Sequence, residues 1–217
     1  MIPSLTLMAG ILAGLAMATP VERRGLQVCY AGEAQDLFCY KKPQGTPQDV
    51  RIADILYAAR ELRAYGTGLK QVLDASGNPV FDENGIPFEE PDYRFLNMTT
   101  TTAGDCGEWT IFSKSETVLV AAKLMTAKMN GIVWYGDIAD TIDGGENATD
   151  DQKKAAIISC GTDGGSREVK GNTTLPAYAE LNKQGVLKEN YTAGQIVIKV
   201  VQNLDWKAAN PGWENDN

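Results

Sequence analysis

Hydrophobic and polar positions along this chain switch between helical and strand spacing, which predicts a domain of mixed structure. The clearest helix is predicted between Thr46, a candidate N-cap followed by Pro47, and Gly66. Its apolar face recurs at helical spacing, at Ile52, Ile55, Leu56, Ala59 and Leu62. The charged residues between them are expected to form a solvated face with local ion pairs: Arg51, Asp54, Arg60, Glu61 and Arg63.

Turn signals dominate residues 67–92. Ser76-Gly77-Asn78-Pro79 and Glu83-Asn84-Gly85-Ile86-Pro87 are separated by Val80 and Phe81, which predicts a meander of hairpins that projects from the domain as an insertion. This segment carries six acidic residues: Asp74, Asp82, Glu83, Glu89, Glu90 and Asp92. Their spacing is not that of a calcium loop, so a solvated acidic excursion is the simplest interpretation, with a cation or a basic partner as alternatives.

Strands are predicted next, at 93–98, 107–112 and 117–124, and we expect them to pair antiparallel. A short helix follows, with Trp134, Ile138 and Ile142 on one face and Gly144-Gly145 as its stop. A capping box at Thr149 to Gln152 opens another helix that runs to Cys160.

The last elements are a helix at 176–184 and a strand at 195–201. The strand is apolar on both faces, which predicts a central position in the sheet. Residues 205–217 are polar and are expected to form a flexible tail.

The N-terminal residues predict secretion. Leu5 to Ala18 is an uncharged apolar run that ends in the small-x-small pattern of a signal peptidase site, so 1–18 is predicted to be a signal peptide. The run is too short to span a bilayer. Arg23-Arg24 before Gly25 is typical of a kexin-type processing site, which makes 19–24 a short pro-segment and 25–204 a single secreted domain.

Two further counts favour an extracellular destination. Four Asn-x-Ser/Thr sequons are candidate glycosylation sites on exposed turns: Asn97, Asn147, Asn172 and Asn190. Four cysteines with no zinc-binding spacing predict two disulfides in any of three connectivities: Cys29, Cys39, Cys106 and Cys160.

Composition excludes several mechanisms. The net charge of −8 argues against binding to nucleic acid or to anionic membrane surfaces. The chain contains no histidine, which excludes Ser-His-Asp and Cys-His catalysis and histidine-ligated zinc. What remains for an enzyme is carboxylate chemistry, a lysine base or a metal held by oxygen ligands, and we expect neither catalysis nor a cofactor.

Asp137 and Asp140 are the candidate acidic site. Three residues apart, they share a helix face, as an acid–base pair or metal site requires, whereas Asp143 lies about 120 degrees away. The simpler interpretation is that Asp137 favours the helix N-terminus and the others face water. The glycine-rich turn at 160–165 is interpreted as a helix C-cap followed by a tight turn, because it follows a helix and an anion cradle opens one.

Short motifs between residues 106 and 201 carry a family resemblance. They are Cys106-Gly-x-Trp-x-Ile-Phe, a Val-Leu-Val-Ala strand, Asp137-Ile-Ala-Asp-Thr-Ile-Asp-Gly-Gly, Cys160-Gly-Thr-Asp-Gly-Gly and Gly194-Gln-Ile-Val-Ile-Lys-Val-Val. In this order they resemble secreted effector-type proteins of plant-associated fungi and, more distantly, the killer-toxin-like proteins of smut fungi.

The resemblance implies an α+β fold, an α/β sandwich with an antiparallel sheet covered by helices on one face, and a non-enzymatic role. By analogy it favours disulfides Cys39–Cys160 and Cys29–Cys106, with the local pair Cys29–Cys39 left open. This chain is acidic and has fewer cysteines than the smut toxin, and no lysine matches the toxin's active one, so channel blocking is not carried over.

We therefore expect a secreted effector or toxin-like protein whose partner is a host or competitor protein or a cell-wall glycan. The alternatives are a secreted carboxylate-dependent glycan hydrolase and a passive cell-wall structural protein.

Overall fold

The structure, a computed structural model, describes residues 35–99, 110–125, 129–188 and 191–213. Several predicted features lie outside these residues: the signal peptide 1–18 with Ala18, the pro-segment 19–24 with Arg23 and Arg24, Cys29, Cys106 and Asn190.

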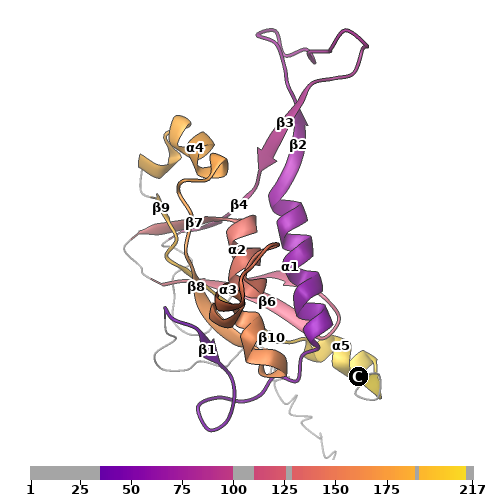
Figure 1. Cartoon of the computed structure of the whole chain (residues 1–217), viewed down its shortest axis with the longest axis vertical. Helices are drawn as coiled ribbons and strands as arrows, with labels where there is room; N and C mark the ends of the chain where they lie inside the picture. The colour runs from indigo at the N-terminus through magenta and orange to yellow at the C-terminus, as the bar shows by residue number, and fades with distance from the viewer. Residues whose placement is uncertain (1–34, 100–109, 126–128, 189–190, 214–217) are drawn as a thin grey trace, which may run out of the picture.

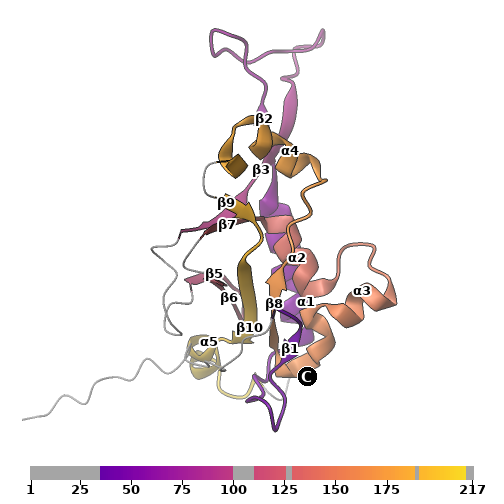
Figure 2. The same cartoon turned by 90° about the vertical axis from the view of Figure 1, so that its left-hand side faces the viewer.

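A five-stranded antiparallel sheet forms the centre of the domain (Figures 1 and 2). Its strand order is β1 (Phe38–Cys39), β8 (Gly165–Val169), β10 (Ile196–Gln202), β6 (Val118–Leu124) and β5 (Thr110–Lys114). The apolar strand near the C-terminus, β10, lies between β8 and β6, which confirms its predicted central position. Because β8 and β6 cover its edges and other side chains pack against both of its faces, every apolar side chain of β10 is buried.

Two helices cover one face of this sheet, which confirms the predicted α+β class. These are α1 (Ile52–Gly66) and α2 (Tyr135–Asp143), which pack against each other (Figure 1). Alternating residues of β6 face them, as the alternation predicts, at Val118, Val120, Ala122 and Leu124. From α1, Ile55, Ala59 and Leu62 enter this core. Each fully buried Ile or Leu there contributes about 1.5–3 kcal/mol relative to exposure.

A second, three-stranded sheet lies beside the main one. It consists of β4 (Phe95–Met98), β7 (Asn130–Trp134) and β9 (Tyr191–Ala193), with β7–β9 parallel. The strand predicted at 93–98 therefore pairs with β7, which the sequence did not predict, and does not pair with β5 or β6. The helix α4 (Pro176–Lys183), followed by the turn η3 (Val186–Lys188), packs on this sheet through Ala177, Tyr178 and Leu181.

Residues 67–93 form an arm that projects from the body, as predicted for the hairpin segment (Figures 1 and 2). The strand β2 (Thr67–Gln71) follows α1 without a break and pairs with β3 (Glu89–Tyr93). Beyond this stem the chain makes two tight turns, closed by bridges between Leu73 and Pro79 and between Phe81 and Pro87.

The predicted start of the first helix is wrong. Helix α1 begins at Ile52, because the preceding segment is extended and bonds to the turn after Cys160. The Gln48 and Val50 amides donate to the carbonyls of Asp163 and Thr162, at 3.2 and 3.0 Å. Thr46 and Pro47 therefore precede a bound strand-like segment and cap no helix.

The apolar face and the solvated face of α1 are also partly wrong. Ile52 and Leu56 are 44% and 46% exposed, whereas Asp54 is only 7% exposed. The apolar face that the helix packs on the sheet is therefore narrower than its sequence suggests. Asp54 is buried because it accepts hydrogen bonds from Thr117.

The helix predicted from the capping box to Cys160 is divided. Thr149 and Gln152 form the capping box, and α3 runs over Asp150–Ala155. The backbone then becomes extended at Ala156 and a separate 3-10 helix, η2 (Ile157–Asp163), follows. The break rotates Cys160 toward β1, where it forms the predicted disulfide with Cys39.

The predicted flexible tail is wrong for its first residues, since α5 spans Leu204–Ala209. The Asn203 side chain caps this helix by accepting from the Trp206 amide at 3.3 Å. The Lys207 ammonium donates to the carbonyls of Gln48 and Asp49, at 3.0 and 2.7 Å. These hydrogen bonds join α5 to the extended segment that precedes α1.

Candidate functional site

Asp137, at the start of α2, is buried and held by two donors. It is 5% exposed, and its Oδ2 accepts from the Tyr178 hydroxyl at 2.6 Å and from the Asn172 amide at 3.3 Å. Burial raises the pKa of Asp137, an effect that these two hydrogen bonds partly oppose and that nearby Asp140 reinforces. Asp137 therefore lies in the first turn of α2, as the simpler interpretation expects, but it is buried there.

Local packing explains why α2 begins where it does. The Trp134 amide donates to the Tyr178 hydroxyl at 3.0 Å, and the indole nitrogen donates to the Gly66 carbonyl at 2.6 Å. A side chain at Gly136 would collide with the Trp134 ring. The indole thus ties the end of α1 to the start of α2 and fixes the orientation of Asp137.

Asp140 and Asp143 are both paired with Arg63, which the sequence placed on a solvated face. The guanidinium bonds both oxygens of Asp143, at 2.8 and 3.1 Å, and one oxygen of Asp140 at 2.7 Å. The Arg63 and Asp143 side chains are 16% and 12% exposed, whereas Asp140 is 49% exposed. Arg63 therefore joins α1 to α2, and Asp140 alone of the three carboxylates reaches well into solvent.

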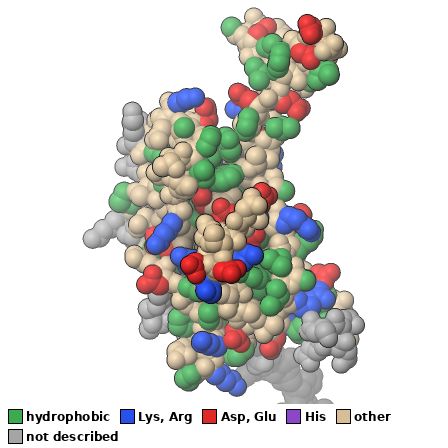
Figure 3. Space-filling view, in the orientation of Figure 1, with side chains coloured by type: hydrophobic (Ala, Val, Ile, Leu, Met, Phe, Trp, Pro, Cys, Tyr) green, Lys and Arg blue, Asp and Glu red, His purple; other side chains and the backbone are tan. Residues whose placement is uncertain are grey.

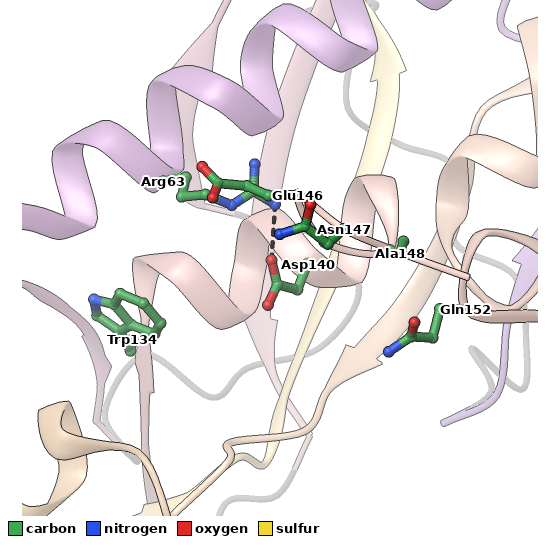
Figure 4. Close-up of a pocket in the computed structure, with 9 residues that line it drawn as sticks. Arg63, Trp134, Asp140, Glu146, Asn147, Ala148 and Gln152 are labelled. Atoms are coloured by element: carbon green, nitrogen blue, oxygen red, sulfur yellow. Dashed lines mark hydrogen bonds and ion pairs between the residues drawn. The ribbon is translucent and has the colours of Figure 1, made fainter. Parts of the chain in front are cut away.

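Two clefts adjoin this carboxylate, and Asp140 lines both. The first, of about 350 Å³, lies between α1, α2 and the turn after it, and Figure 4 shows Trp134 and Gln152 at its opposite sides with Arg63 and Asp140 between them. The second, of about 290 Å³, lies between α2 and β8. Most of the residues that line it have polar or charged side chains: Asp137, Asp140, Thr141, Arg167, Glu168, Lys170, Asn172 and Leu175.

The structure thus brings the two predicted acidic residues, Asp137 and Asp140, to the wall of one cleft. Sequence reasoning missed Arg63 and Tyr178, which lie 77 and 41 residues from their partners and carry no local signal. Among the residues that the structure describes, no group of three or more carboxylate, thiol or imidazole side chains is placed to hold a metal ion.

Two sequons lie at the same clefts. Asn147 lines the first and Asn172 lines the second, and both are exposed on turns. Asn97 is exposed too, but it lies in strand β4 and not on a turn. Both of these candidate glycosylation sites therefore lie in clefts that Asp140 also lines.

The glycine-rich turn after Cys160 has a structural role, because its backbone carbonyls accept hydrogen bonds from the segment that precedes α1. The carbonyls of Thr162, Asp163 and Gly164 accept from residues 40–50, and Gly161 and Gly164 have φ of 62° and 67°, where a side chain is strained. The carbonyls of this turn are therefore used to bind residues 40–50.

Comparison of the chain with models of protein families, with curated proteins and with solved structures found no match. Within the described residues, no helix has both the length and the apolar character that crossing a bilayer requires.

Proposed function

We propose that this chain is a secreted fungal effector or toxin-like protein that acts by binding and not by catalysis. Its target is a host protein, a competitor protein or a cell-wall glycan. The main observation behind this proposal is the arm. It is a hairpin extension that projects from a disulfide-bonded body, and its large apolar side chains are exposed. Apolar exposure of this kind is typical of interaction surfaces.

Other observations support the secreted part of the proposal. The Cys39–Cys160 bond joins residues 121 apart, and such structural disulfides persist in oxidising compartments. The three sequons inside the described residues are all exposed. The relationship to killer-toxin-like proteins stays a proposal that rests on the short motifs of the sequence.

A gene deletion tests the biological role. Deletion should reduce virulence or antagonism of competing microbes, and the wild-type gene should restore it. A matched allele, in which residues 72–88 are replaced by Asn-Gly to close β2 and β3 directly, should be secreted but should not restore the phenotype. Unchanged virulence and unchanged antagonism after deletion would contradict the role.

Affinity capture tests the binding itself. The mature chain from Gly25 is immobilised and exposed to host extract and, separately, to purified wall polysaccharides. The arm-shortened chain is the control for each capture. If the mature chain and the arm-shortened chain retain the same partners, the arm is not needed for binding.

A glycan hydrolase is the second candidate, and the surroundings of Asp137 and Asp140 favour it. Burial raises the pKa of Asp137, as a general acid requires, while Asp140 is exposed and ion-paired in the same cleft. A pair of carboxyl groups in unlike environments is the arrangement that glycosidases use.

Release of reducing sugar from purified wall polysaccharides tests this candidate. Activity that is present in the wild type and lost in Asp137→Asn with Asp140→Asn would establish it. The control is Asp151→Asn, since Asp151 is 94% exposed on α3 and outside both clefts. A wild-type protein that releases no sugar removes the hydrolase from consideration.

A further inference from the structure

The apex of the arm, residues 72–88, exposes large apolar side chains far from the body of the protein (Figures 1 and 3). Leu73, Phe81, Ile86 and Phe88 are between 50% and 60% exposed, and Leu69 on the stem is 65% exposed. A single exposed leucine needs no explanation, but several large apolar side chains on one small projection indicate a contact surface.

The apex is built from two copies of one eight-residue unit. Leu73-Asp74 and Phe81-Asp82 each open a turn that passes through a glycine of positive φ, Gly77 at 84° and Gly85 at 77°. In both copies one aspartate oxygen accepts two backbone amides, at 2.8 and 2.9 Å. The second unit therefore repeats the fold of the first and places Phe81 where the first places Leu73.

A closed ring of backbone hydrogen bonds holds the two units together. The Val72 amide donates to the Phe88 carbonyl, the Phe88 amide to Val80 and the Val80 amide to Val72, each at 2.9 Å. These three residues are spaced eight apart, so the ring follows from the repeat. The apex is thus ordered by its own backbone, which lowers the entropy lost when its side chains bind a partner.

Negative charge surrounds the apolar side chains, and Figure 3 shows both kinds together at the tip. Residues 72–92 contain six acidic and no basic side chains. On the stem, Glu90 pairs with Lys70 at 3.3 Å and Asp92 with Arg94 at 3.7 Å, so both of these cations lie outside the apex and are already paired. The charge that faces outward at the apex is negative.

Two of these charges are built into the turns. Hydrogen bonds from backbone amides, those of Asn78 and Ser76 for Asp74 and that of Ile86 for Asp82, lower the pKa of both carboxyl groups. Asp74 and Asp82 therefore stay ionised at a lower pH than an unperturbed aspartate does. A second copy of this chain and an anionic membrane would both be repelled by the negative charge of the apex.

We propose that the apex of the arm binds a cationic amphipathic segment of a partner protein, in which Lys or Arg flank apolar side chains. Phe81 and Ile86 contact the apolar side chains, and the cations face Glu83 of the apex and Glu89, the first residue of the adjoining stem strand β3. Electrostatic complementarity accelerates the encounter and selects the partner, while the apolar contact slows dissociation. The inference rests on the proposed binding function and names the chemistry of the target.

Synthetic peptides with an apolar centre flanked by Lys and Arg are the probe, and the full mature chain is the protein. Two matched peptide sets replace either the basic residues with Glu or the apolar residues with Ser. Only the cationic amphipathic set should bind, and its affinity should fall as salt is raised. Phe81→Ser with Ile86→Ser should weaken binding by about tenfold or more.

Control variants test whether binding depends on the apex itself or on any exposed apolar or acidic side chain of the protein. Tyr57→Ser, which removes an aromatic ring 46% exposed on α1, should leave peptide binding unchanged. Glu83→Gln with Glu89→Gln should reduce affinity and flatten its salt dependence, whereas Glu61→Gln with Asp151→Asn should not. Thermal unfolding should be unaltered in all four variants, because the changed side chains are exposed.

Several outcomes would overturn the inference. The first is that peptides with Glu in place of the basic residues bind as tightly as the cationic set. The second is that the apex variants bind the cationic peptides as tightly as the wild type, and the third is that no peptide binds. Apex-dependent dimerisation in light scattering would assign the surface to a second copy, and apex-dependent binding to phosphatidylserine vesicles would assign it to a membrane. If the chain captures a host target that the Phe81→Ser, Ile86→Ser variant also captures, the proposed function stands and the apex inference fails.

Discussion

The Tyr178 hydroxyl donates a 2.6 Å hydrogen bond to Asp137 Oδ2, and this contact joins α4 to α2 beneath a polar cleft. Tyr178 is fully buried and accepts in turn from the Trp134 amide. Burial and the adjacent Asp137 raise the pKa of Tyr178, so its hydroxyl stays protonated and remains a donor. These contacts link the small sheet, α2 and α4 through one hydroxyl group.

Asp137→Asn should raise the free energy of unfolding at neutral pH. The folded pKa of Asp137 lies above the ordinary value of about 3.9, so the native state binds more protons than the unfolded state between the two values. The contribution of Asp137 to stability therefore falls as pH rises through this window. Urea unfolding should show the gain of the variant at neutral pH and its disappearance in acid.

Tyr178→Phe provides the contrast, since it removes the donor and leaves the carboxyl group buried. The free energy of unfolding should drop by about 1–3 kcal/mol at neutral pH. Tyr57→Phe on the exposed side of α1 is the control. Equal stability of Tyr178→Phe and this control would show that the Tyr178–Asp137 bond contributes nothing.

Asp54→Asn should destabilise the protein, with the opposite dependence on pH. Asp54 Oδ2 accepts from the Thr117 hydroxyl at 2.5 Å and amide at 3.0 Å, and Arg51 donates to both oxygens. Burial alone raises the pKa of Asp54, but the bonds from Arg51 and Thr117 outweigh it and the net pKa is lowered. The loss should be about 1.5–3 kcal/mol at neutral pH.

The sign follows from the lowered pKa of Asp54. Its contribution is fully present above the ordinary carboxyl pKa of about 3.9 and is lost as pH falls through the folded value. Wild-type and Asp54→Asn stabilities should therefore converge in acid. A gap that persists unchanged at low pH would contradict the assignment, and Asp151→Asn serves as the exposed control.

Arg63→Met should weaken the packing of α1 on α2. The methionine keeps the apolar stem but leaves Asp143 without its bidentate partner. We expect a loss of about 1–2 kcal/mol, since the Asp143 side chain is mostly buried and Asp140 is half-exposed. A double-mutant cycle with Asp143→Asn measures the coupling, and Arg60→Met, on the exposed side of α1, is the control.

Replacing Cys39 and Cys160 with serine should lower stability more than any of these changes. The bond closes a loop of 121 residues in the unfolded chain, which corresponds to about 4–5 kcal/mol on the loop-entropy model. Peptide mapping under non-reducing conditions checks the pairing. Recovery of Cys39 linked to any cysteine other than Cys160 would contradict it.

Much of the fold was predictable because its signals are local. Helices α2 and α4, the capping box of α3 and the apolar strands β6 and β10 all show the spacing of their class. The turns of the arm were predictable from glycine and proline, whose backbone preferences hold without tertiary partners.

Strand β7 was missed although its residues favour a strand, and Trp134, predicted on the face of the following helix, is the last residue of this strand. Other missed elements lack a local signal. Strand β8, Gly165-Ser-Arg-Glu-Val169, has no apolar alternation and is a strand because β10 and β1 offer their hydrogen-bonding edges. The start of α1 and the helix α5 depend on carbonyls of residues 48, 49, 162 and 163, which are brought together only by folding.

For the candidate site, the shared helix face of Asp137 and Asp140 could be read from residue spacing, because helical spacing is a property of the backbone. The folded structure was needed to show that Asp137 is buried and bonded to Tyr178, that Arg63 pairs with both Asp140 and Asp143, and that the apolar side chains of the arm are exposed. The physical reason is range: hydrogen-bonded turns and helical faces are set within a few residues, whereas burial and charge pairing depend on which distant segments the fold brings into contact.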